Sequence, residues 1–488
     1  MMAARVGSLL SALAVVGVSV VDATFNTAYK PTCTEIETIG NLSSASNVIW
    51  PVQAVSYSQA TKHWFLSSDQ NPSCVIEPAT PEDISKILQI VGPARIPFAI
   101  QSGGHASNPG FSSTQGVHIS LKKLNQVILS EDRQTVEVGF GQTWKDIYDA
   151  LEPYNLNVVG GRVIGPGVGG FTLGGGYSWK TNQFGLTCDT VERFNIVLPN
   201  GTITYATDSH NPDLFWALKG GQNRFGIVTS AVIRTHPQSQ VWGGLRIYPS
   251  TSVPALLNAT KRFFYENTDP KASIITTLEG SAVGTTALVL FFYDGPEKPS
   301  SFDLFDGIPY LISSTSNKKW TSFLQSFPAS LKLNLRGTFA TVSTSELTPR
   351  FLEAVKNETD SIGKEKPFHS GTTVSYDIEP FTNYGQHSTE SAFPHADSPL
   401  PLNLYFSWAK ASDDVWWYNR MKESLVTLKQ VAIEEGIFLD SYTAYPNYAI
   451  SGTTAEELYG VNNAARLRAI RSRIDPDRVM DLAGGFEI

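Results

Sequence analysis

The stretch PFAIQSGGHASNPGFSS, residues 97–113, decides the fold. The apolar run from Ile96 to Ile100 predicts a buried strand. Gly103, Gly104 and His105 follow this run almost at once. Glycine leaves the backbone N–H groups bare, and such groups directly after a strand are typical of a loop that approaches a ligand.

A second and denser glycine region spans residues 160–189, GGRVIGPGVGGFTLGGGYSWKTNQFGLTCD, and contains ten glycines. Each glycine weakens a helix or strand by roughly 0.5–1 kcal/mol relative to alanine, so such clustering needs a backbone reason. One interpretation is a concave anion site, in which this loop and the loop at Ser102 clasp the pyrophosphate of a dinucleotide from two sides. The alternative is tight turns and close backbone packing.

The Rossmann pattern does not fit this chain. The stretch GPGVGG, Gly165 to Gly170, has the GxGxxG spacing, but it lies in the middle of a domain. More glycine follows it instead of a clean helix, whereas a Rossmann fingerprint opens a helix directly after a first strand. No Walker loop, HExxH or GxSxG motif occurs either.

The composition favours a globular protein that acts on a small molecule. The chain has 488 residues and a formal net charge of −8, with no lysine or arginine run. That charge argues against nucleic acid and anionic membranes as partners. The eight histidines are scattered without metal-ligand spacing, so we expect no metal site.

The N-terminus predicts export. Arg5 precedes an uncharged run from Val6 to Val21, and Val21 and Ala23 suit a cleavage site, so residues 1–23 are interpreted as a signal peptide of a secreted protein. The run is short for a membrane span, and we expect none after cleavage. An oxidising compartment permits a disulfide, for which Cys33 and Cys74 are the candidate pair and Cys188 is left over. Glycosylation sequons occur at Asn41, Asn200, Asn258 and Asn357.

Periodicity predicts mixed helices and strands up to His236. A helix begins at Thr80-Pro81, with an apolar face that includes Ile84, Ile87, Leu88 and Val91. Further elements are a strand at 135–139, a helix at 143–151, a strand at 156–159, a hairpin at Asn200-Gly201 and a helix capped by Asn211. From Val241 onward, β-rich runs alternate with helices at 256–265, 350–360 and 415–434, and a last helix ends at Asp475-Pro476.

We therefore predict an α+β fold of two lobes. The second lobe would be an antiparallel sheet with helices on one face, which is a common way to wall off a ligand. The predicted division is a signal peptide at 1–23, an N-terminal segment at 24–69, a cofactor-binding domain at 70–236, a substrate-binding domain at 237–435 and a C-terminal segment at 436–488 that returns to the cofactor domain.

Five stretches in order along the chain carry a family resemblance: PFAIQSGGHASNPGFSS, VGGFTLGGGYSWKTNQFGLTCD, FNIVLPNG, DLFWALKGGQNRFGIVT and LYGVNNAARLRAIRSRIDPDRVM. Together they closely resemble the berberine bridge enzyme-like FAD-linked oxidases, which belong to the wider vanillyl-alcohol oxidase class with a PCMH-type FAD-binding domain. The resemblance covers nearly all of the mature chain. It implies a PCMH-type FAD-binding domain joined to the substrate domain.

The resemblance also implies which residues hold the flavin. Ser102, Gly103 and Gly104 would hold the pyrophosphate, and His105 would be bonded covalently to the 8α position of the flavin. The other implied contacts are Gly165, Gly167, Gly169, Gly170, Gly174, Gly175, Gly176, Tyr177, Ile227 and Val228, with Asn462 facing the ring. Many relatives carry a second link through a cysteine where this chain has Val163, so we expect a single link and a less oxidising flavin.

In this class the flavin takes a hydride from a substrate carbon, a base removes a proton, and oxygen usually reoxidises the flavin. By the resemblance, AFPHADSPLPLNLYFSW offers Asn403 and Tyr405 on one strand face, and AYPNYA offers Tyr445 and Tyr448. We rank Tyr448 first as the base, then Tyr445 and Tyr405, although core packing is the ordinary role of a tyrosine. A tyrosine base needs a pKa below its usual value of about 10.

Two departures from the family pattern bear on these roles. The acidic residue that relatives carry shortly after the NY pair is absent, because Ile450 and Ser451 stand there, so a carboxylate-assisted mechanism is not expected. His395 lacks the arginine that usually follows it, since Ala396 takes that place, and we interpret His395 as structural.

The sequence thus predicts a secreted FAD oxidase that acts on an alcohol of a small molecule, as in a natural-product tailoring step, with oxygen as electron acceptor. The alternatives are a sugar or oligosaccharide oxidase and, from another class, a flavin-bearing binding protein with little turnover.

Overall fold

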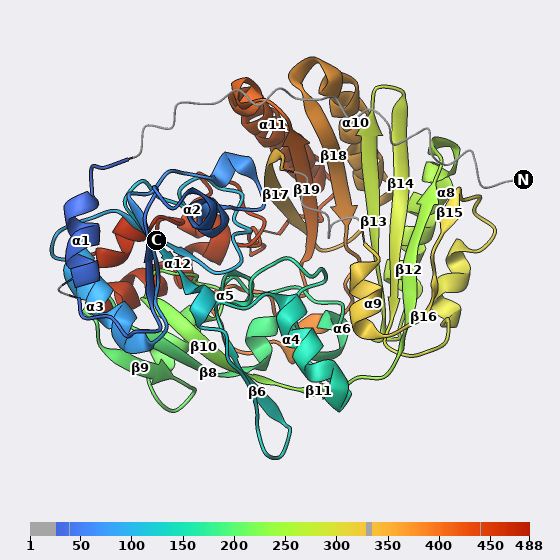
Figure 1. Ribbon diagram of the computed structural model, residues 1–488. Coiled ribbons are helices and arrows are strands. Elements are labelled where there is room, and N and C mark those ends of the chain that lie inside the picture. The colour runs from blue at the N-terminus through green and yellow to red at the C-terminus, as the bar shows by residue number, and fades with distance from the viewer. Residues whose placement is uncertain (1–25, 39, 328–333, 440) are drawn as a thin grey trace, which may run out of the picture.

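The computed structural model describes residues 26–38, 40–327, 334–439 and 441–488. The proposed signal peptide lies outside these residues. Two lobes stand side by side in Figure 1, and both contain sheets and helices. The predicted α+β class is confirmed.

The first lobe begins with a small sheet in the order β1-β2-β4-β3. The strands β2, β4 and β3 run parallel, and β1 pairs antiparallel with β2. Their bounds are β1 (Asn47–Ile49), β2 (Cys74–Glu77), β3 (Phe98–Gln101) and β4 (Val117–Ser120). The strand β3 begins two residues later than predicted, after Pro97, which has no N–H to donate to a ladder.

A second, antiparallel sheet has the order β5-β6-β10-β8-β9. Its predicted hairpin is confirmed: β8 and β9 pair antiparallel, and Gly201 turns between them at φ +86°. The bounds are β5 (Val127–Leu129), β6 (Thr135–Gly139), β8 (Val191–Val197), β9 (Ile203–Ala206) and β10 (Ile227–Arg234). The short strands β7 (Leu156–Asn157) and β11 (His236–Pro237) pair beside this sheet.

The helices of this lobe follow their sequence signals. The helix α3 (Pro81–Val91) starts after Thr80, whose side chain accepts a hydrogen bond from the Asp83 N–H. Asn211 occupies the predicted N-cap position before α7 (Pro212–Leu218), but its φ is +54° and its side chain forms no capping hydrogen bond; its amide donates to the Tyr205 carbonyl. The others are α1 (Lys30–Thr38), α2 (Ala54–Thr61), α4 (Trp144–Leu151), α5 (Val168–Leu173) and α6 (Thr181–Phe184).

The second lobe is one eight-stranded sheet in the order β15-β12-β14-β13-β18-β19-β17, with β16 also paired to β12. All the strand pairs of this sheet within the described residues are antiparallel, as predicted. The bounds are β12 (Val241–Tyr248), β13 (Ala272–Ser281), β14 (Gly284–Tyr293), β15 (Ile312–Ser313), β16 (Ser316–Lys318), β17 (Arg336–Thr344), β18 (Gly371–Ile378) and β19 (Leu400–Trp408).

Three long helices pack against one face of this sheet (Figure 1). They are α8 (Val253–Glu266), α10 (Pro349–Glu365) and α11 (Asp414–Glu434), and the short helix α9 (Trp320–Gln325) lies against α4 of the first lobe. The phenol of Tyr376 on β18 shares a hydrogen bond of 2.7 Å with Ser424 on α11. Because side chains alternate along a strand, Asp377 and Ser375 must face away from the helices.

The C-terminal part of the chain packs on the first lobe. The helix α12 (Ala455–Ile474) contacts α7, and Arg224 donates to the Met480 and Phe486 carbonyls. Gly460 interrupts the helical geometry of α12 with φ +71°. The lobe therefore contains residues from both ends of the described chain.

The predicted disulfide is present. Cys33 on α1 is bonded to Cys74 at the start of β2, with 6.1 Å between their Cα atoms, and Cys188 is free and buried. The four sequon asparagines, Asn41, Asn200, Asn258 and Asn357, are all exposed.

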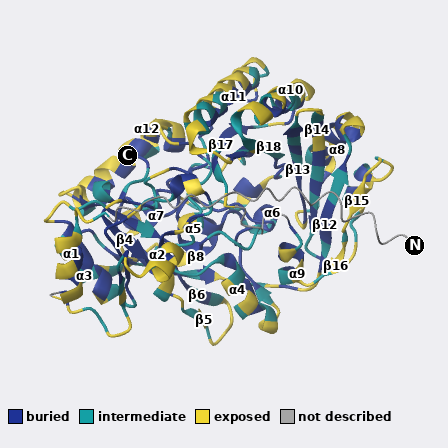
Figure 2. Cartoon of the chain, turned by 45° about the horizontal axis from the view of Figure 1, so that its top comes forward, coloured by how far each residue is buried: buried dark blue, intermediate teal, exposed yellow. Residues whose placement is uncertain are grey.

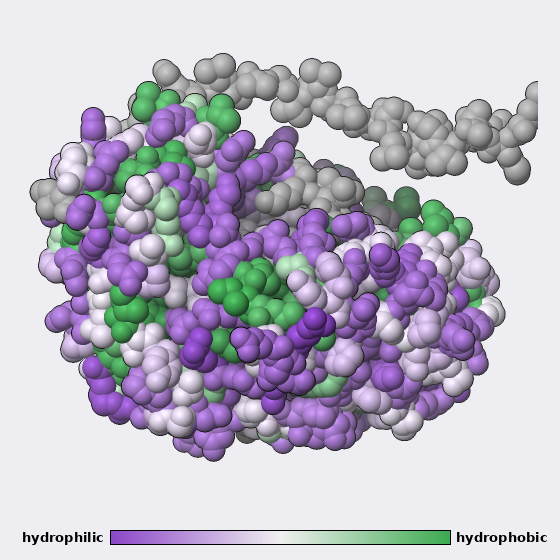
Figure 3. Space-filling view, turned by 60° about the horizontal axis from the view of Figure 1, so that its bottom comes forward, coloured by the Kyte–Doolittle hydropathy of each residue, from purple (hydrophilic) through white to green (hydrophobic). Residues whose placement is uncertain are grey.

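Buried residues gather inside both lobes, and exposed residues lie on the outer surface (Figure 2). The face drawn in Figure 3 is mainly hydrophilic, with one compact hydrophobic group near its middle. Among the described residues, no helix has both the length and the apolar character that a bilayer crossing requires.

One buried ion pair joins the lobes. Lys180, just before α6, lies 2.6 Å from Asp294, which follows β14, and the side chain of Lys180 is 0% exposed. Gln183 and Gln238 also donate to Asp294. Burial lowers the pKa of Lys180, while Lys180 outweighs the opposite effect of burial on Asp294 and lowers the pKa of its carboxyl.

Asp294→Asn is expected to destabilise the protein by about 3–5 kcal/mol, because it leaves the Lys180 ammonium buried without its counter-charge. Thermal and urea unfolding will measure the loss. The control is Arg262→Gln, which breaks an exposed pair with Glu266 on α8 and should leave the melting temperature almost unchanged. Equal shifts for the two variants would contradict the structural role of the buried pair.

Candidate active site

The two glycine loops touch each other through their backbones. A Cβ atom on Gly103 would lie 2.3 Å from the Gly167 nitrogen, and one on Gly167 would lie 2.1 Å from the Gly103 nitrogen. Ser102 joins the same loops, since its hydroxyl donates to the Phe140 carbonyl at 2.6 Å and accepts from the Gly169 N–H at 3.2 Å. The loop after β3 and the loop before α5 therefore form one unit.

At most of the predicted cofactor-binding glycines, close packing leaves no space for a side chain. A Cβ atom on Gly174 would lie 2.0 Å from the Asn447 amide oxygen, and one on Gly176 would lie 2.5 Å from the Thr187 hydroxyl. Gly170 is different, because it is exposed and nothing lies within 4 Å of the place a Cβ would take. Close packing, the alternative reason for the glycines, thus explains several of them, while Gly170 leaves open space beside the backbone.

A short helix begins inside the GPGVGG stretch, where the sequence led us to expect no clean helix. The helix α5 starts at Val168 and has only six residues. The stretch is reached from β7 through a loop and not directly from a first strand, so the argument against a Rossmann fold stands on the topology.

His105 lies between an aromatic side chain and the second glycine loop. Its ring stacks on Trp64, with 4.6 Å between centroids and 20° between planes. A Cβ atom on Gly165 would lie 3.0 Å from His105 Nε2, so only glycine leaves the imidazole this much room. Trp64 is held in turn by a hydrogen bond of 2.8 Å from its backbone N–H to the Gly104 carbonyl.

Tyr177 and Tyr445 belong to a fully buried cluster. The Tyr445 hydroxyl accepts from the N–H groups of Gly176 and Tyr177, at 3.1 and 3.3 Å, and from the Asn447 amide. Tyr177 shares a hydrogen bond of 2.6 Å with Tyr384 from the second lobe. Burial raises the pKa of Tyr177 far above its usual value and that of Tyr445 to about 12. These contacts favour a structural role for Tyr445.

Tyr448 has a different environment, since it contacts a carboxylate and a guanidinium. Its hydroxyl donates to Glu379 Oε1 at 3.1 Å and accepts from Arg162. Arg162 and Glu379 form a bidentate ion pair with distances of 2.8 and 2.9 Å, and both are largely buried. Among the candidate tyrosines, only Tyr448 is bonded to a group that can take a proton.

Burial dominates the pKa values in this group. It raises the pKa of Tyr448 well above the usual value of a phenol, against the opposing effect of Arg162. It also raises the pKa of Glu379, again opposed by Arg162. The guanidinium remains charged, because Glu379 outweighs the effect of burial and raises the pKa of Arg162. A resting phenolate at Tyr448, which the sequence argument required, is therefore not favoured.

Asn403 and Tyr405 lie on the face of β19 that turns away from α10 and α11, together with residues of the neighbouring strands. The Asn403 amide donates to Asp377 on β18 at 2.9 Å. Tyr405 stacks on Phe339 of β17, with centroids 5.3 Å apart, and Phe65 packs against both rings. Burial raises the pKa of Tyr405, and no charged group among the described residues is hydrogen-bonded to its hydroxyl. We assign Tyr405 to an aromatic wall.

Ring contacts connect His105 to Tyr448. His105 stacks on Trp64, whose neighbour Phe65 lies 5.3 Å from Phe339, and Phe339 lies 6.2 Å from Tyr448. The predicted residues from the first lobe, the sheet and the C-terminal segment therefore converge on one region.

The remaining predicted contacts lie less centrally. Ile227 and Val228 are buried at the start of β10. Asn462 is exposed on α12, whereas its neighbour Asn463 donates to the Ala392 carbonyl at 3.0 Å. The exposure of Asn462 gives no support to a place beside a buried ring.

Three residues of the site escaped the sequence analysis: Arg162, Asp377 and Glu379. Two signals were available. Arg162 is the only charged residue between Gly160 and Gly176, and Asp377 and Glu379 have the spacing of two that places both on one face of a strand. The carboxylates that the sequence lacks after Tyr448 thus come from another strand.

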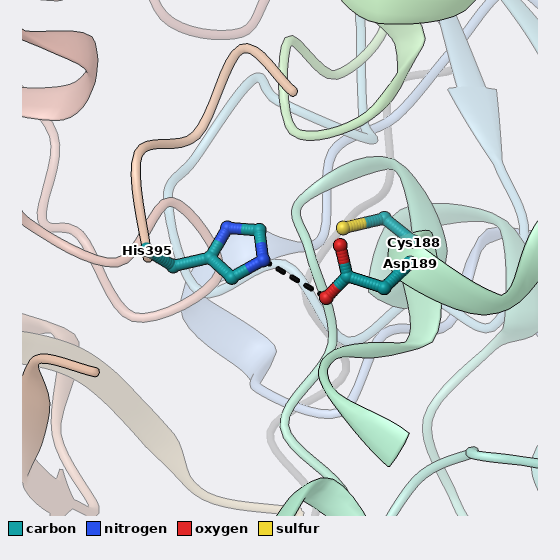
Figure 4. A group of neighbouring side chains, drawn as sticks. All are labelled: Cys188, Asp189 and His395. Carbon is teal, nitrogen blue, oxygen red and sulfur yellow. Dashed lines mark hydrogen bonds and ion pairs between the residues drawn. The ribbon is translucent and has the colours of Figure 1, made fainter. Parts of the chain in front are cut away.

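His395 forms part of a buried group with Cys188 and Asp189 (Figure 4). Its Nε2 lies 2.9 Å from Asp189, which also accepts from the Leu186 N–H and from Thr389. Burial alone would lower the pKa of His395, but Asp189 outweighs it and raises that pKa. The side chains satisfy one another, which supports a structural role.

Two surface pockets flank this group and share Thr389. One of about 350 Å³ is lined by Asp189, Lys219 and Arg234 among others, and one of about 490 Å³ by Trp216, His395 and Arg466 among others. Neither is lined by His105 or Tyr448, so both are distinct from the candidate active site.

Comparisons with known proteins agree with an FAD-binding fold. Residues 72–207 match the family model described as an FAD binding domain. The chain is 31% identical over 472 residues to an FAD-dependent monooxygenase of Aspergillus calidoustus, covering 91% of this chain and 88% of that protein.

Two solved structures share the fold. A berberine bridge enzyme variant has a TM-score of 0.77 at 18% identity, covering 93% of this chain and 100% of the other. A chitooligosaccharide oxidase has a TM-score of 0.75 at 19% identity, covering 94% and 100%. The chain belongs to the family of FAD-dependent oxidoreductases that includes the monooxygenase of Aspergillus calidoustus, and it shares the fold of the berberine bridge enzyme.

Proposed function

We propose that this protein is a secreted FAD-linked oxidase that removes a hydride from an alcohol carbon of a small molecule, in the manner of a natural-product tailoring step, with oxygen as electron acceptor. The observation that carries the proposal is the buried group of Tyr448, Glu379 and Arg162, which joins a phenol to a proton-accepting carboxylate. The ring contacts that lead from this group to His105 bring it toward the proposed point of flavin attachment.

The two glycine loops fit an FAD. Open space beside Gly170 and the room that Gly165 leaves for the His105 imidazole allow a ligand to approach the backbone closely. The residues that would hold the cofactor are Ser102 to Gly104, Gly165, Gly167, Gly169, Gly170 and Gly174 to Gly176, with His105 as the covalent link. Val163 has an aliphatic side chain and cannot form a thioether, so a single link is proposed.

The chemistry that FAD supplies when bound is acceptance of a hydride from carbon, followed by reoxidation with oxygen. The chain itself must accept the hydroxyl proton. A phenol with a raised pKa is a poor resting base, but the Tyr448 oxygen can take the substrate proton while its own proton passes to Glu379 Oε1. Arg162 favours the ionised form of Glu379 before the transfer and is a positioning residue.

The substrate class has a second candidate. The likeness to a chitooligosaccharide oxidase supports a sugar or oligosaccharide oxidase, since aromatic side chains such as Phe339 and Tyr405 stack on sugars as well as on planar rings. The relative in Aspergillus calidoustus is named an FAD-dependent monooxygenase, a name that supports oxidation of a substrate and does not identify that substrate. A flavin-bearing binding protein with little turnover is the remaining alternative.

Secretion is supported by the Cys33–Cys74 disulfide and by the exposure of all four sequon asparagines. Mass spectrometry of protein from the culture medium of a secreting host, before and after deglycosylation, will test both export and occupancy of the sequons.

The function is tested first by anaerobic stopped-flow mixing with a panel of benzylic alcohols, secondary alcohols and oligosaccharides. We expect the flavin absorbance to bleach with alcohols and hydrogen peroxide to form once air is admitted. Bleaching by oligosaccharides alone would favour the sugar oxidase, and no bleaching by any member would favour the binding protein.

Covalent attachment is expected at His105 alone. After acid precipitation the wild-type pellet should remain yellow, and the peptide that contains His105 should carry the mass of the flavin. In His105→Ala the colour should pass into the supernatant. A flavin mass on the peptide that contains Val163, or release of flavin from the wild type, would overturn the proposed link.

The reaction rate is expected to fall as the pH falls through the raised pKa of Glu379, because only the ionised carboxylate accepts the proton. The apparent pKa of this acidic limb of the pH–rate profile should lie above the ordinary glutamate pKa of about 4.3. Glu379→Gln should remove this limb and lower kcat by about 10²-fold or more, and Tyr448→Phe should lower kcat comparably. The control is Glu365→Gln, which changes a carboxylate on α10, on the other side of the sheet from Glu379. It should leave both kcat and the pH–rate profile unchanged. An unchanged profile in Glu379→Gln would exclude Glu379 as the acceptor.

A further inference from the structure

A row of polar side chains crosses four neighbouring strands of the large sheet. Thr341 on β17 is paired with Asn403 on β19, Asn403 with Asp377 on β18, and Asp377 with Thr277 on β13. Directly opposed residues of antiparallel strands project from the same face. This is the face opposite to α10 and α11, because Tyr376 points to the helices.

The orientation of the Asn403 amide is fixed within this row. Asp377 Oδ1 accepts from the Thr277 hydroxyl at 2.7 Å, and Oδ2 accepts from Asn403 Nδ2 at 2.9 Å. An ionised carboxylate only accepts hydrogen bonds, so the NH₂ end of the amide must face Asp377. Asn403 Oδ1 is therefore the end that faces away from Asp377.

Two buried polar atoms of the row have no partner among the described residues. They are Asn403 Oδ1 and Thr341 Oγ1, on side chains that belong to residues only 6% and 8% exposed. A buried polar atom without a hydrogen bond is costly, and such atoms in native proteins need an explanation. Their direct opposition on β17 and β19 points to one shared ligand group.

The neighbours of the row limit the kind of ligand. Phe339 on β17 and Tyr405 on β19 lie two residues from Thr341 and Asn403 along these strands, and their rings form a flat stacked pair. In the other direction, Glu379 comes directly after β18, two residues beyond Asp377, and is bonded to Tyr448. The row thus lies between a flat aromatic surface and the proposed proton acceptor.

We propose that the row recognises a hydroxyl group on a planar aromatic substrate, distinct from the alcohol that is oxidised. A hydroxyl donates to Asn403 Oδ1 and accepts from Thr341 Oγ1, whereas a methyl ether or a ketone can only accept. Asp377 is a positioning residue that keeps Asn403 Oδ1 turned toward the ligand. This inference rests on the proposed function, because it names the substrate class of the same site.

The test uses 4-hydroxybenzyl alcohol and 4-methoxybenzyl alcohol with the flavin-loaded protein. Perturbation of the visible flavin spectrum, or its rate of bleaching under anaerobic conditions, gives the apparent Kd of each probe. The wild type should prefer the hydroxyl probe by about tenfold or more, since the ether leaves Asn403 Oδ1 unpaired. Cellobiose, a hydroxylated but nonplanar probe, should bind more weakly than either.

Two variants examine the row. Asp377→Asn offers both a donor and an acceptor, so the Asn403 amide can turn over and the preference should fall to about twofold or less. Thr341→Val removes a donor from which the oxygen of either probe can accept, so it should weaken the binding of both probes and leave their ratio close to the wild-type value. The matched control is Asp360→Asn on α10, whose carboxylate also accepts from a threonine hydroxyl, that of Thr285 at 2.6 Å, but on the far side of the sheet. It should keep the wild-type preference.

The ratio between probes separates recognition from general damage, which would weaken both probes alike. Equal affinities in the wild type, binding of neither probe, tighter binding of cellobiose, or an unchanged ratio in Asp377→Asn would each overturn the inference. A preserved ratio without any bleaching by the alcohol panel would instead count against the proposed oxidation and leave the recognition row standing.

Discussion

The backbone of the loop after β3 rests directly on the backbone of the loop before α5, and no side chain fits between them at Gly103 and Gly167. This contact determines where His105 and Trp64 stand, because both are held to the same loop. It also explains why glycines gather at two distant places in the sequence. Gly170, three residues beyond this contact, leaves open space beside the backbone.

The chemical side of the site comes from three separate parts of the chain. Arg162 lies in the second glycine region, Glu379 follows β18, and Tyr448 belongs to the segment that returns to the first lobe. A buried ion pair of this kind is expensive to desolvate and is weak evidence for stability in itself. Its position between lobes, bonded to a phenol, agrees better with a role in proton transfer than with a role in holding the fold.

Local elements were predictable because their signals are local. The Thr80 cap, the Asn200-Gly201 turn and the apolar face of α3 each depend on a few adjacent residues, and each was found as expected. Asn211 does precede the helix, but its side chain forms no capping hydrogen bond, and its backbone has the left-handed φ of +54° instead of the extended geometry of an ordinary cap. The Glu379–Arg162 pair could not be found in this way, since 217 residues separate its members and only the fold brings them together. The pKa of Tyr448 likewise depends on burial, which no local pattern reports.

The return of the C-terminal segment to the first lobe has a consequence for biosynthesis. Arg224 is bonded to the carbonyls of Met480 and Phe486, and Asn108 to that of Ala449, so the lobe contains residues that are more than 250 positions apart in the sequence. Domains generally fold as units once their residues are available. This lobe therefore completes its fold only after residues 449–486 have been synthesised, and a chain truncated before them lacks part of the flavin-binding lobe.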